Sequence, residues 1–222
     1  HLAGQALMST EVDIYNLALA NIGQKATVAS LTELSVERQR CTQFYASCLR
    51  KVLAAHAWSF ATKRETLAEV TNDTEAWDYK YALPNLYIHA LAVLESDSLD
   101  WHDSFAFVVE GSYLYTNVDA ADLRFVWYQD NPGHFTAWFE EALACLLASR
   151  IAGPIIKGAM GRQERNDQYK AYLVALGQAK ELDSNQSKNN PVFVPSGIAA
   201  RGGMSIHSFD DLISEQRSRR LR

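Results

Sequence analysis

Apolar side chains recur every three or four positions in two segments near the start of the chain. The first segment begins after Ser9 or Thr10, either of which can cap a helix, and ends at Gly23. The second segment begins at Ser35 and runs to about residue 58. This spacing places the apolar side chains on one face of a helix, so the pattern predicts two amphipathic helices.

From about residue 58 the apolar positions change from helical spacing to alternation. Extended segments of this kind are predicted at residues 77–84, 86–94 and 122–130. Residues 105–117 alternate on both sides of Gly111 and Ser112, which predicts a hairpin with an exposed turn. The middle of the chain is therefore expected to form antiparallel β structure.

Helical spacing returns in the last third of the chain. A third helix is predicted over residues 134–153, ending at Gly153-Pro154, and a fourth over residues 161–186. Because none of the four apolar faces can stay in water, the helices are expected to pack together. The predicted fold class is α+β and predominantly helical: a four-helix bundle with an inserted small antiparallel β region and an extended C-terminal arm.

The composition changes again beyond residue 187. The stretch NNPVFVPSGIAARGG contains two prolines, three glycines and no apolar face that a helix or strand can bury. We therefore divide the chain into four parts: an upstream segment at residues 1–8, a helical bundle domain formed by residues 9–59 and 131–187, an inserted β region at residues 60–130, and a C-terminal arm at residues 188–222.

Charge is distributed unevenly between the arm and the rest of the chain. The formal net charge is −5, but residues 188–222 hold six Lys and Arg against three Asp and Glu, which leaves −8 for the remainder. A charged block at a chain end is typical of an interaction tail. The sequence shows neither an apolar run long enough to span a bilayer nor a secretory signal, so no membrane contact is predicted.

The common catalytic and nucleotide-binding motifs are absent from the sequence. It lacks a phosphate-binding glycine loop, a G-x-S-x-G elbow and an H-E-x-x-H helix. Cys48 and His56 suggest a thiol with its base, but eight positions along one helix separate them by about 12 Å. The three cysteines lack the paired spacing of a zinc site. We therefore predict no enzyme activity, no cofactor and no metal.

Two clusters in the β region have a functional and a structural interpretation. A metal site is suggested by the group His89, His102, Asp97, Asp100 and Asp103. In a polar loop, such residues are more often solvated charges. The aromatic residues between Trp77 and Tyr128 suggest a stacking platform for single-stranded nucleic acid. Because Arg124 is the single basic residue between Asp97 and Asp130, we interpret these aromatic residues as packing within a sheet and an interface.

Several segments, taken in order, resemble one known family. They are Asn16-Leu17-Ala18-Leu19 and Trp58-Ser59-Phe60 within residues 13–68, then YKYALPNLYIHALAVL and VVEGSYLYTN, then FTAWFEEALACLLASRIAGPI followed by YKAYLVALGQAKELDSNQS. Together they resemble the tail tubular protein A type of head-to-tail adaptor (connector) in short-tailed bacteriophages. The resemblance covers nearly all of residues 9–187, and residues 204–222 lie outside it.

The resemblance implies a structural virion protein without catalysis. In that family many copies, typically twelve, form a homo-oligomeric ring under the portal protein. The ring joins the portal to the tail tube or nozzle, around the channel through which DNA is ejected. The implied location is the head-to-tail interface of the virion, after assembly in the host cytoplasm, with transient contact to genomic DNA. Because the body is acidic, we expect Asp and Glu to line the channel.

The family also suggests which residues meet the partners. Its C-terminal extension reaches the portal, and the arm of this chain has apolar and basic residues that can order on a neighbour. Binding to the portal or a neighbouring subunit is therefore predicted for Pro191, Val192, Phe193, Val194, Pro195, Ile206, Phe209, Leu212, Ile213, Arg217, Arg219, Arg220 and Arg222. Contact with the tail tube is predicted for the hairpin turn, Gly111 and Ser112.

Two other functions are compatible with the sequence. The terminal RSRRLR can contact phosphates, which would make the chain a nucleic-acid-binding module that uses its basic C-terminal arm. An enzyme with the polar loop at residues 97–103 as its site is the third hypothesis.

Overall fold

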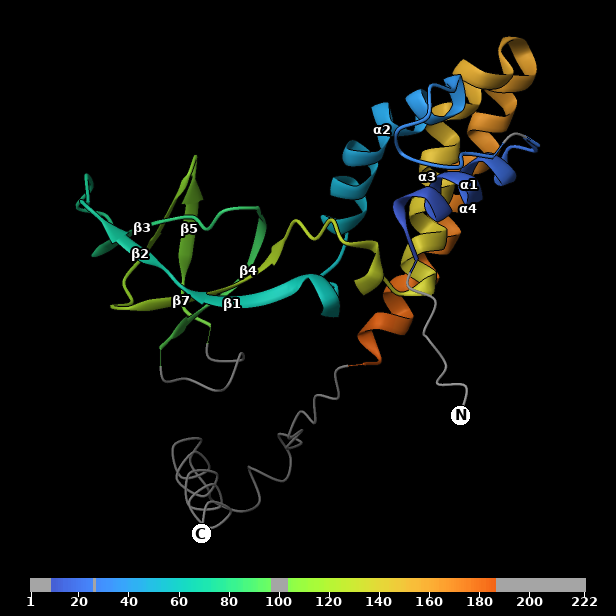
Figure 1. The fold of residues 1–222 in the computed structure, drawn as a ribbon. Coiled ribbons are helices and arrows are strands. Elements are labelled where there is room, and N and C mark those ends of the chain that lie inside the picture. Colours follow the sequence, from blue (N-terminus) through green and yellow to red (C-terminus); the bar gives the residue numbers. More distant parts are fainter. Residues whose placement is uncertain (1–8, 26, 97–103, 187–222) are drawn as a thin grey trace, which may run out of the picture. The chain divides into compact units, whose positions relative to one another are not determined.

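The computed structural model describes residues 9–25, 27–96 and 104–186 of the 222-residue chain (Figure 1). In these ranges lie four α-helices and seven strands, the strands forming two antiparallel sheets. No helix in these ranges is both long and apolar enough to cross a membrane. The upstream segment and the C-terminal arm predicted from the sequence fall outside the described residues.

Helix α1 (Glu11–Asn21) has both ends fixed by local structure. Thr10 is its cap: the Thr10 hydroxyl accepts from the Asp13 N–H, and the Asp13 carboxylate accepts from the Thr10 N–H. Ser9 has a different role, since its hydroxyl donates to Glu140 at the start of α3. At the other end Gly23 takes a φ of 71°, which a side chain would disfavour, and the helix stops there as predicted.

Helix α3 (Ala137–Ile156) is the centre of the helical part. It packs against α1, α2 (Val36–Leu53) and α4 (Gly158–Ser184), whereas α1 and α2 make few contacts with one another. Eleven of its twenty residues are buried. A helix that is apolar around most of its circumference is typical of one surrounded by others. The helices therefore group around α3.

Helix α3 continues past Gly153-Pro154, where the sequence pattern predicted its end. Proline has no N–H for the carbonyl four residues earlier, so one helical hydrogen bond is lost. Ile155 and Ile156, which follow the proline, pack against the helical core, and this burial offsets the loss. The chain then reverses at Lys157, whose φ is 61°, and α4 begins at the next residue.

The strands form one sheet of three and one of four, with every neighbouring pair antiparallel. In order across the first sheet lie β1 (Thr62–Thr66), β7 (Ala121–Trp127) and β4 (Tyr87–Glu95). In order across the second lie β2 (Ala68–Val70), β3 (Tyr79–Ala82), β6 (Tyr113–Thr116) and β5 (Phe107–Glu110). The predicted hairpin is present as β5 and β6.

Buried apolar side chains form two separate clusters. The helical cluster draws on α1, α2, α3 and α4, on the segment around Trp58 and on Val126 of β7. The β cluster consists of Leu67, Tyr81, Val93, Leu114, Val118, Ala121, Leu123 and Phe125. The β part is thus stabilised by apolar burial of its own.

The predicted fold class was wrong in treating the β part as a small insert in a helical bundle. The protein is an α+β fold of four helices and two antiparallel sheets. Residues 62–70 were not assigned to strands from the sequence, yet they form β1 and β2. Strand β1 is polar and shows no alternation, and its place is set by backbone pairing with β7, from Thr62 opposite Val126 to Thr66 opposite Asp122.

We predict opposite effects for two glycines of α4. A Cβ at Gly161 would lie 3.1 Å from the carbonyl oxygen of Ala152 in α3, whereas a Cβ at Gly177 would meet nothing within 4 Å. Gly177→Ala should raise the free energy of unfolding by about 0.5–1 kcal/mol through helix propensity. Gly161→Leu should lower it by about 1–3 kcal/mol, because the two backbones must separate.

Urea denaturation of these variants measures both effects. Gly177→Leu is the matched control for the larger side chain, since Gly177 is exposed. A Gly161→Leu protein as stable as the Gly177→Leu protein would show that α3 and α4 do not approach closely at this point.

A second pair of variants tests two neighbouring tyrosines whose ring centroids lie 5.4 Å apart. The Tyr15 hydroxyl donates to the Glu11 carboxylate, and its oxygen lies 3.3 Å from the Thr42 hydroxyl. The buried Tyr45 hydroxyl has no hydrogen-bond partner among the described residues. Tyr15→Phe should lower the free energy of unfolding by about 1 kcal/mol. Tyr45→Phe should leave it unchanged or raise it, because no hydrogen bond is lost. Equal losses from both, measured by thermal denaturation, would contradict this difference.

Candidate functional site

The turn predicted to contact a tail tube lies at the exposed end of the β5–β6 hairpin. Glu110 and Tyr113 pair across the hairpin, and the exposed Gly111 and Ser112 join them. Gly111 has a φ of 60° and Ser112 does not have a positive φ, as in a type II′ turn. The Leu83 N–H donates to the Ser112 carbonyl at 3.0 Å, which fixes the turn against the loop that follows β3. The turn is accessible to a partner, and its contact with a tail tube stays a prediction.

Lys80 of β3 contacts two tyrosine side chains of this hairpin. Its ammonium lies 2.8 Å from the Asp73 carboxylate, 4.2 Å from the centre of the Tyr113 ring and 5.5 Å from that of Tyr115. The hydrogen bond with Asp73 raises the pKa of Lys80, so the amine stays charged. A buried ammonium held by a carboxylate and two aromatic faces is a structural cation, which positions β6 and the turn that precedes it.

The other residues predicted as sites are placed as follows. Every residue predicted to bind a portal or a neighbouring subunit, from Pro191 to Arg222, lies outside the described residues. So do His102 and the three aspartates of the suggested metal group. His89 is half-buried in β4, and burial lowers its pKa. The described residues contain no group of three or more side chains suited to a metal ion.

Cys48 and His56 do not form a thiol–base pair. The Nε2 atom of His56 lies 3.3 Å from Oδ2 of Asp183. Cys48 is buried in the helical core, and this burial raises the pKa of its thiol to about 11. The thiol is therefore protonated at neutral pH and packs as a small apolar side chain.

Asp183 joins the end of α4 to the segment between α2 and β1. Its carboxylate accepts from the Ser59 backbone N–H at 3.1 and 3.2 Å and from the Ser59 hydroxyl at 2.8 Å, and His56 contacts its other side. Asp183 is buried, so these donors replace water around the charge. The serine proton faces the carboxylate instead of the imidazole. This arrangement holds two segments together and does not activate a nucleophile.

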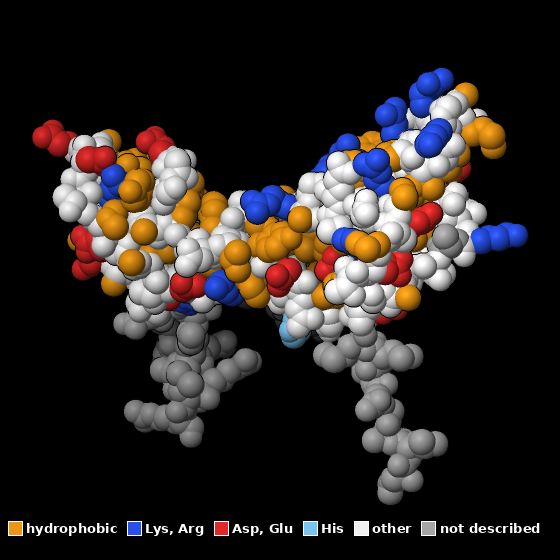
Figure 2. Space-filling model, turned by 45° about the horizontal axis from the view of Figure 1, so that its top comes forward, with side chains coloured by type: hydrophobic (Ala, Val, Ile, Leu, Met, Phe, Trp, Pro, Cys, Tyr) orange, Lys and Arg blue, Asp and Glu red, His pale blue; other side chains and the backbone are white. Residues whose placement is uncertain are grey.

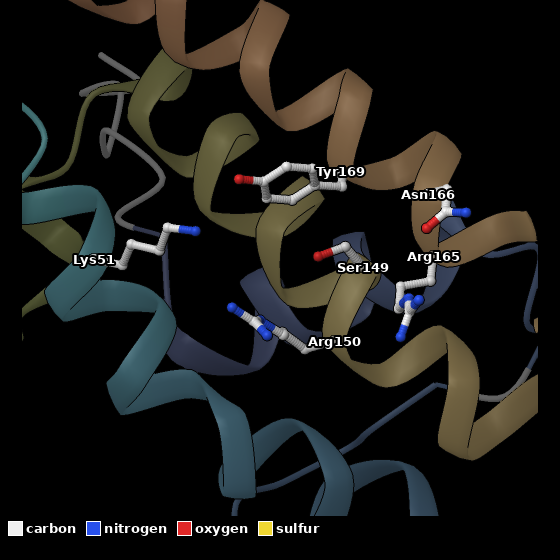
Figure 3. Close-up of a pocket in the computed structure, with 6 residues that line it drawn as sticks. All are labelled: Lys51, Ser149, Arg150, Arg165, Asn166 and Tyr169. Carbon is white, nitrogen blue, oxygen red and sulfur yellow. The ribbon is translucent and has the colours of Figure 1, made fainter. Parts of the chain in front are cut away.

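A pocket of about 300 Å³ lies between α2, α3 and α4 (Figure 3). It is lined by Lys51, Ser149, Arg150, Arg165, Asn166 and Tyr169. The Ser149 hydroxyl donates to the Leu146 carbonyl at 2.6 Å, so its proton is already engaged. In Figure 3 the side chains of Lys51 and Arg150 extend from neighbouring helices into the same space. The pocket therefore brings polar side chains of three helices to one concave surface.

The pocket is strongly basic. Lys51 comes from α2, Arg150 from α3 and Arg165 from α4, and all three are exposed. Within the described part of the chain, none of the three forms an ion pair with a carboxylate. Figure 2 shows further Lys and Arg side chains gathered over the helical elements. This positive surface belongs to a chain whose net charge is −5, so the basic groups are concentrated locally.

Sequence reasoning missed this pocket because its residues come from three helices far apart in the chain. One feature of the sequence did indicate the pocket. Arg150 is the single basic residue of α3, in a stretch of buried residues that includes Leu146 and Ile151. A lone cation within such a helix indicates that one side of the helix opens onto a polar surface.

A comparison with models of known protein families finds none that matches this chain. A comparison with curated protein sequences also finds no match. The resemblance to phage adaptors therefore depends on the ordered segments of residues 9–187 described above.

We predict that the joint at Asp183 contributes strongly to stability. Asp183→Asn should lower the free energy of unfolding by about 1–3 kcal/mol, because it weakens charge-assisted hydrogen bonds to a buried carboxylate. Glu181→Gln is the matched control: it removes one negative charge from an exposed position two residues away. Urea denaturation followed by tryptophan fluorescence measures both. Equal effects from the two substitutions would show that the joint adds nothing beyond net charge.

Proposed function

We propose that this protein is a structural subunit of a ring-shaped adaptor between the portal and the tail tube of a short-tailed bacteriophage. The proposal starts from the ordered resemblance of residues 9–187 to the tail tubular protein A type of adaptor. The order of elements agrees with the order predicted from the sequence, since two helices precede the strands and two follow them. In this proposal the chain acts through its surfaces, with DNA passing through the channel that the ring encloses.

The observation that carries the proposal is the division of the described residues into two hydrophobic clusters, each with exposed apolar side chains of its own. In the helical part, Leu34 is 89% exposed and Val36 61%. In the β part, Val108 and Tyr113 are exposed on the hairpin that carries the Gly111 turn. An adaptor must meet a different partner on each side. Two separately stabilised parts supply two independent surfaces for that purpose.

The proposal that the chain acts through its surfaces agrees with the environments of several potentially catalytic side chains among the described residues. His56, Ser59 and Asp183 are engaged with one another in a joint between segments. Burial raises the pKa of Cys41 to about 12 and that of Cys48 to about 11, so neither thiol is a nucleophile at neutral pH. The pocket between the helices is lined by cations and neutral polar groups and has no carboxylate or imidazole among its lining residues.

Particle mass in solution tests the proposal. The full chain, alone or mixed with the portal protein of the same virus, should form a closed ring of about twelve copies, seen by light scattering and negative-stain microscopy. A small particle that neither closes into a ring nor binds a portal would contradict the adaptor proposal. A monomer that binds nucleic acid through residues 217–222 would favour the alternative, a nucleic-acid-binding module.

Truncation after residue 187 tests the arm separately. The four helices and two sheets are complete before that point, so the truncated chain should keep its circular dichroism spectrum and lose portal attachment. Phe193→Ala and Phe209→Ala should each weaken attachment by a few kcal/mol if both side chains are buried anchors. Loss of the folded spectrum would show that the arm belongs to the core. Full attachment by the truncated chain would show that portal binding uses other residues.

A further inference from the structure

We propose that the pocket between α2, α3 and α4 is a binding site for a phosphate group. The site consists of Lys51, Arg150 and Arg165 with the side chains of Asn166 and Tyr169. This inference is independent of the adaptor proposal, since it concerns one pocket within a single chain.

The first argument is that no carboxylate among the described residues neutralises the three cations. Three positive side chains from three helices line one pocket, and like charges brought together repel one another. The acidic residues of the neighbouring α4 turns are engaged elsewhere: Asp167 pairs with Lys170 at 3.1 Å, and Glu164 accepts from Gln168 at 2.9 Å. No described carboxylate pairs with the three cations. An anion from outside would relieve this repulsion.

The second argument is that the pocket holds Lys51 in place. Its ammonium lies 5.1 Å from the centre of the Tyr169 ring and 5.6 Å from that of Tyr172. Tyr172 is buried and therefore fixed, and Tyr169 lies beside it on α4 with ring centroids 5.7 Å apart. Cation–π contacts with two rings limit the freedom of a long side chain. The ammonium is thereby held over the pocket before any ligand arrives (Figure 3).

The third argument concerns which anion fits. Two guanidinium groups offer planar pairs of N–H donors, and the ammonium, the Asn166 amide and the Tyr169 hydroxyl add donors from other directions. A carboxylate has two oxygens and one charge, so it would leave part of this set unused. A phosphate has more oxygens and up to two charges, arranged in three dimensions. The pocket volume of about 300 Å³ also leaves room for the molecule that carries the phosphate.

Two sources can supply such a group: a free phosphate compound or the backbone of a nucleic acid. The test uses the full chain and two variants with equal loss of charge. Lys51→Gln/Arg165→Gln removes two cations of the pocket, and Arg40→Gln/Arg162→Gln removes two exposed cations from the same two helices outside it. All four positions are exposed, so both proteins should fold, which circular dichroism checks. Titration calorimetry at low ionic strength then measures binding of inorganic phosphate, a single-stranded oligonucleotide and acetate.

The pocket variant should bind phosphate about tenfold more weakly or worse, while the control variant stays within about twofold of the native chain. That result supports the site with a free phosphate compound as ligand. The same pattern seen with the oligonucleotide alone supports the site with a nucleic-acid backbone as ligand. Equal weakening in both variants shows attraction to net charge and overturns the proposal. Acetate binding as tight as phosphate binding, or no binding of either phosphate probe, also overturns it.

Discussion

Burial of Trp58 is the interaction on which the joining of helices and sheets depends. The indole N–H donates to the Val52 carbonyl at 2.9 Å, and the fully buried ring packs against Phe139 of α3 with ring centroids 5.0 Å apart. Phe60 and Phe135 complete the cluster, with ring centroids 4.9 and 4.8 Å from that of Phe139. The chain leaves the helices through Trp58 and Phe60 and returns to them through Phe135. Both connections between the helical part and the β part are therefore held by one aromatic cluster.

The same junction receives the end of α4. Asp183 binds Ser59 directly after Trp58, and the Ser59 hydroxyl also reaches the Gln186 side chain at 3.2 Å. Three segments thus meet at the junction: the end of α2, the start of α3 and the last turn of α4. Burial of the apolar cluster stabilises the junction. The Asp183 carboxylate fixes how the segments are oriented, because a buried charge is costly without its hydrogen-bond donors. This combination explains how two clusters with separate interiors are joined within one chain.

Features set by neighbouring residues were predictable from the sequence, and features set by distant ones were not. The cap at Thr10, the stop at Gly23 and the turn at Gly111 follow from local backbone chemistry and lie where they were expected. Strand β1 is polar and exists because it pairs with β7, so no pattern within it could reveal it. The helix through Pro154 depends on packing against the core. The basic pocket forms only where three helices meet. In the sequence, its one indication was Arg150, a lone basic residue in an apolar helix.

The central position of α3 has a consequence for the order in which the chain can fold. Ribosomal synthesis releases α1 and α2 long before α3, which begins only at Ala137. Until then the apolar faces of the first two helices have no partner, since they contact each other little. Strand β1 likewise cannot pair until β7 has been synthesised. Helices α3 and α4 are joined directly at Lys157, so they can pack as soon as both are made. The nascent chain therefore carries unburied helices until α3 has been synthesised, and these are the segments that chaperones and self-association would meet first.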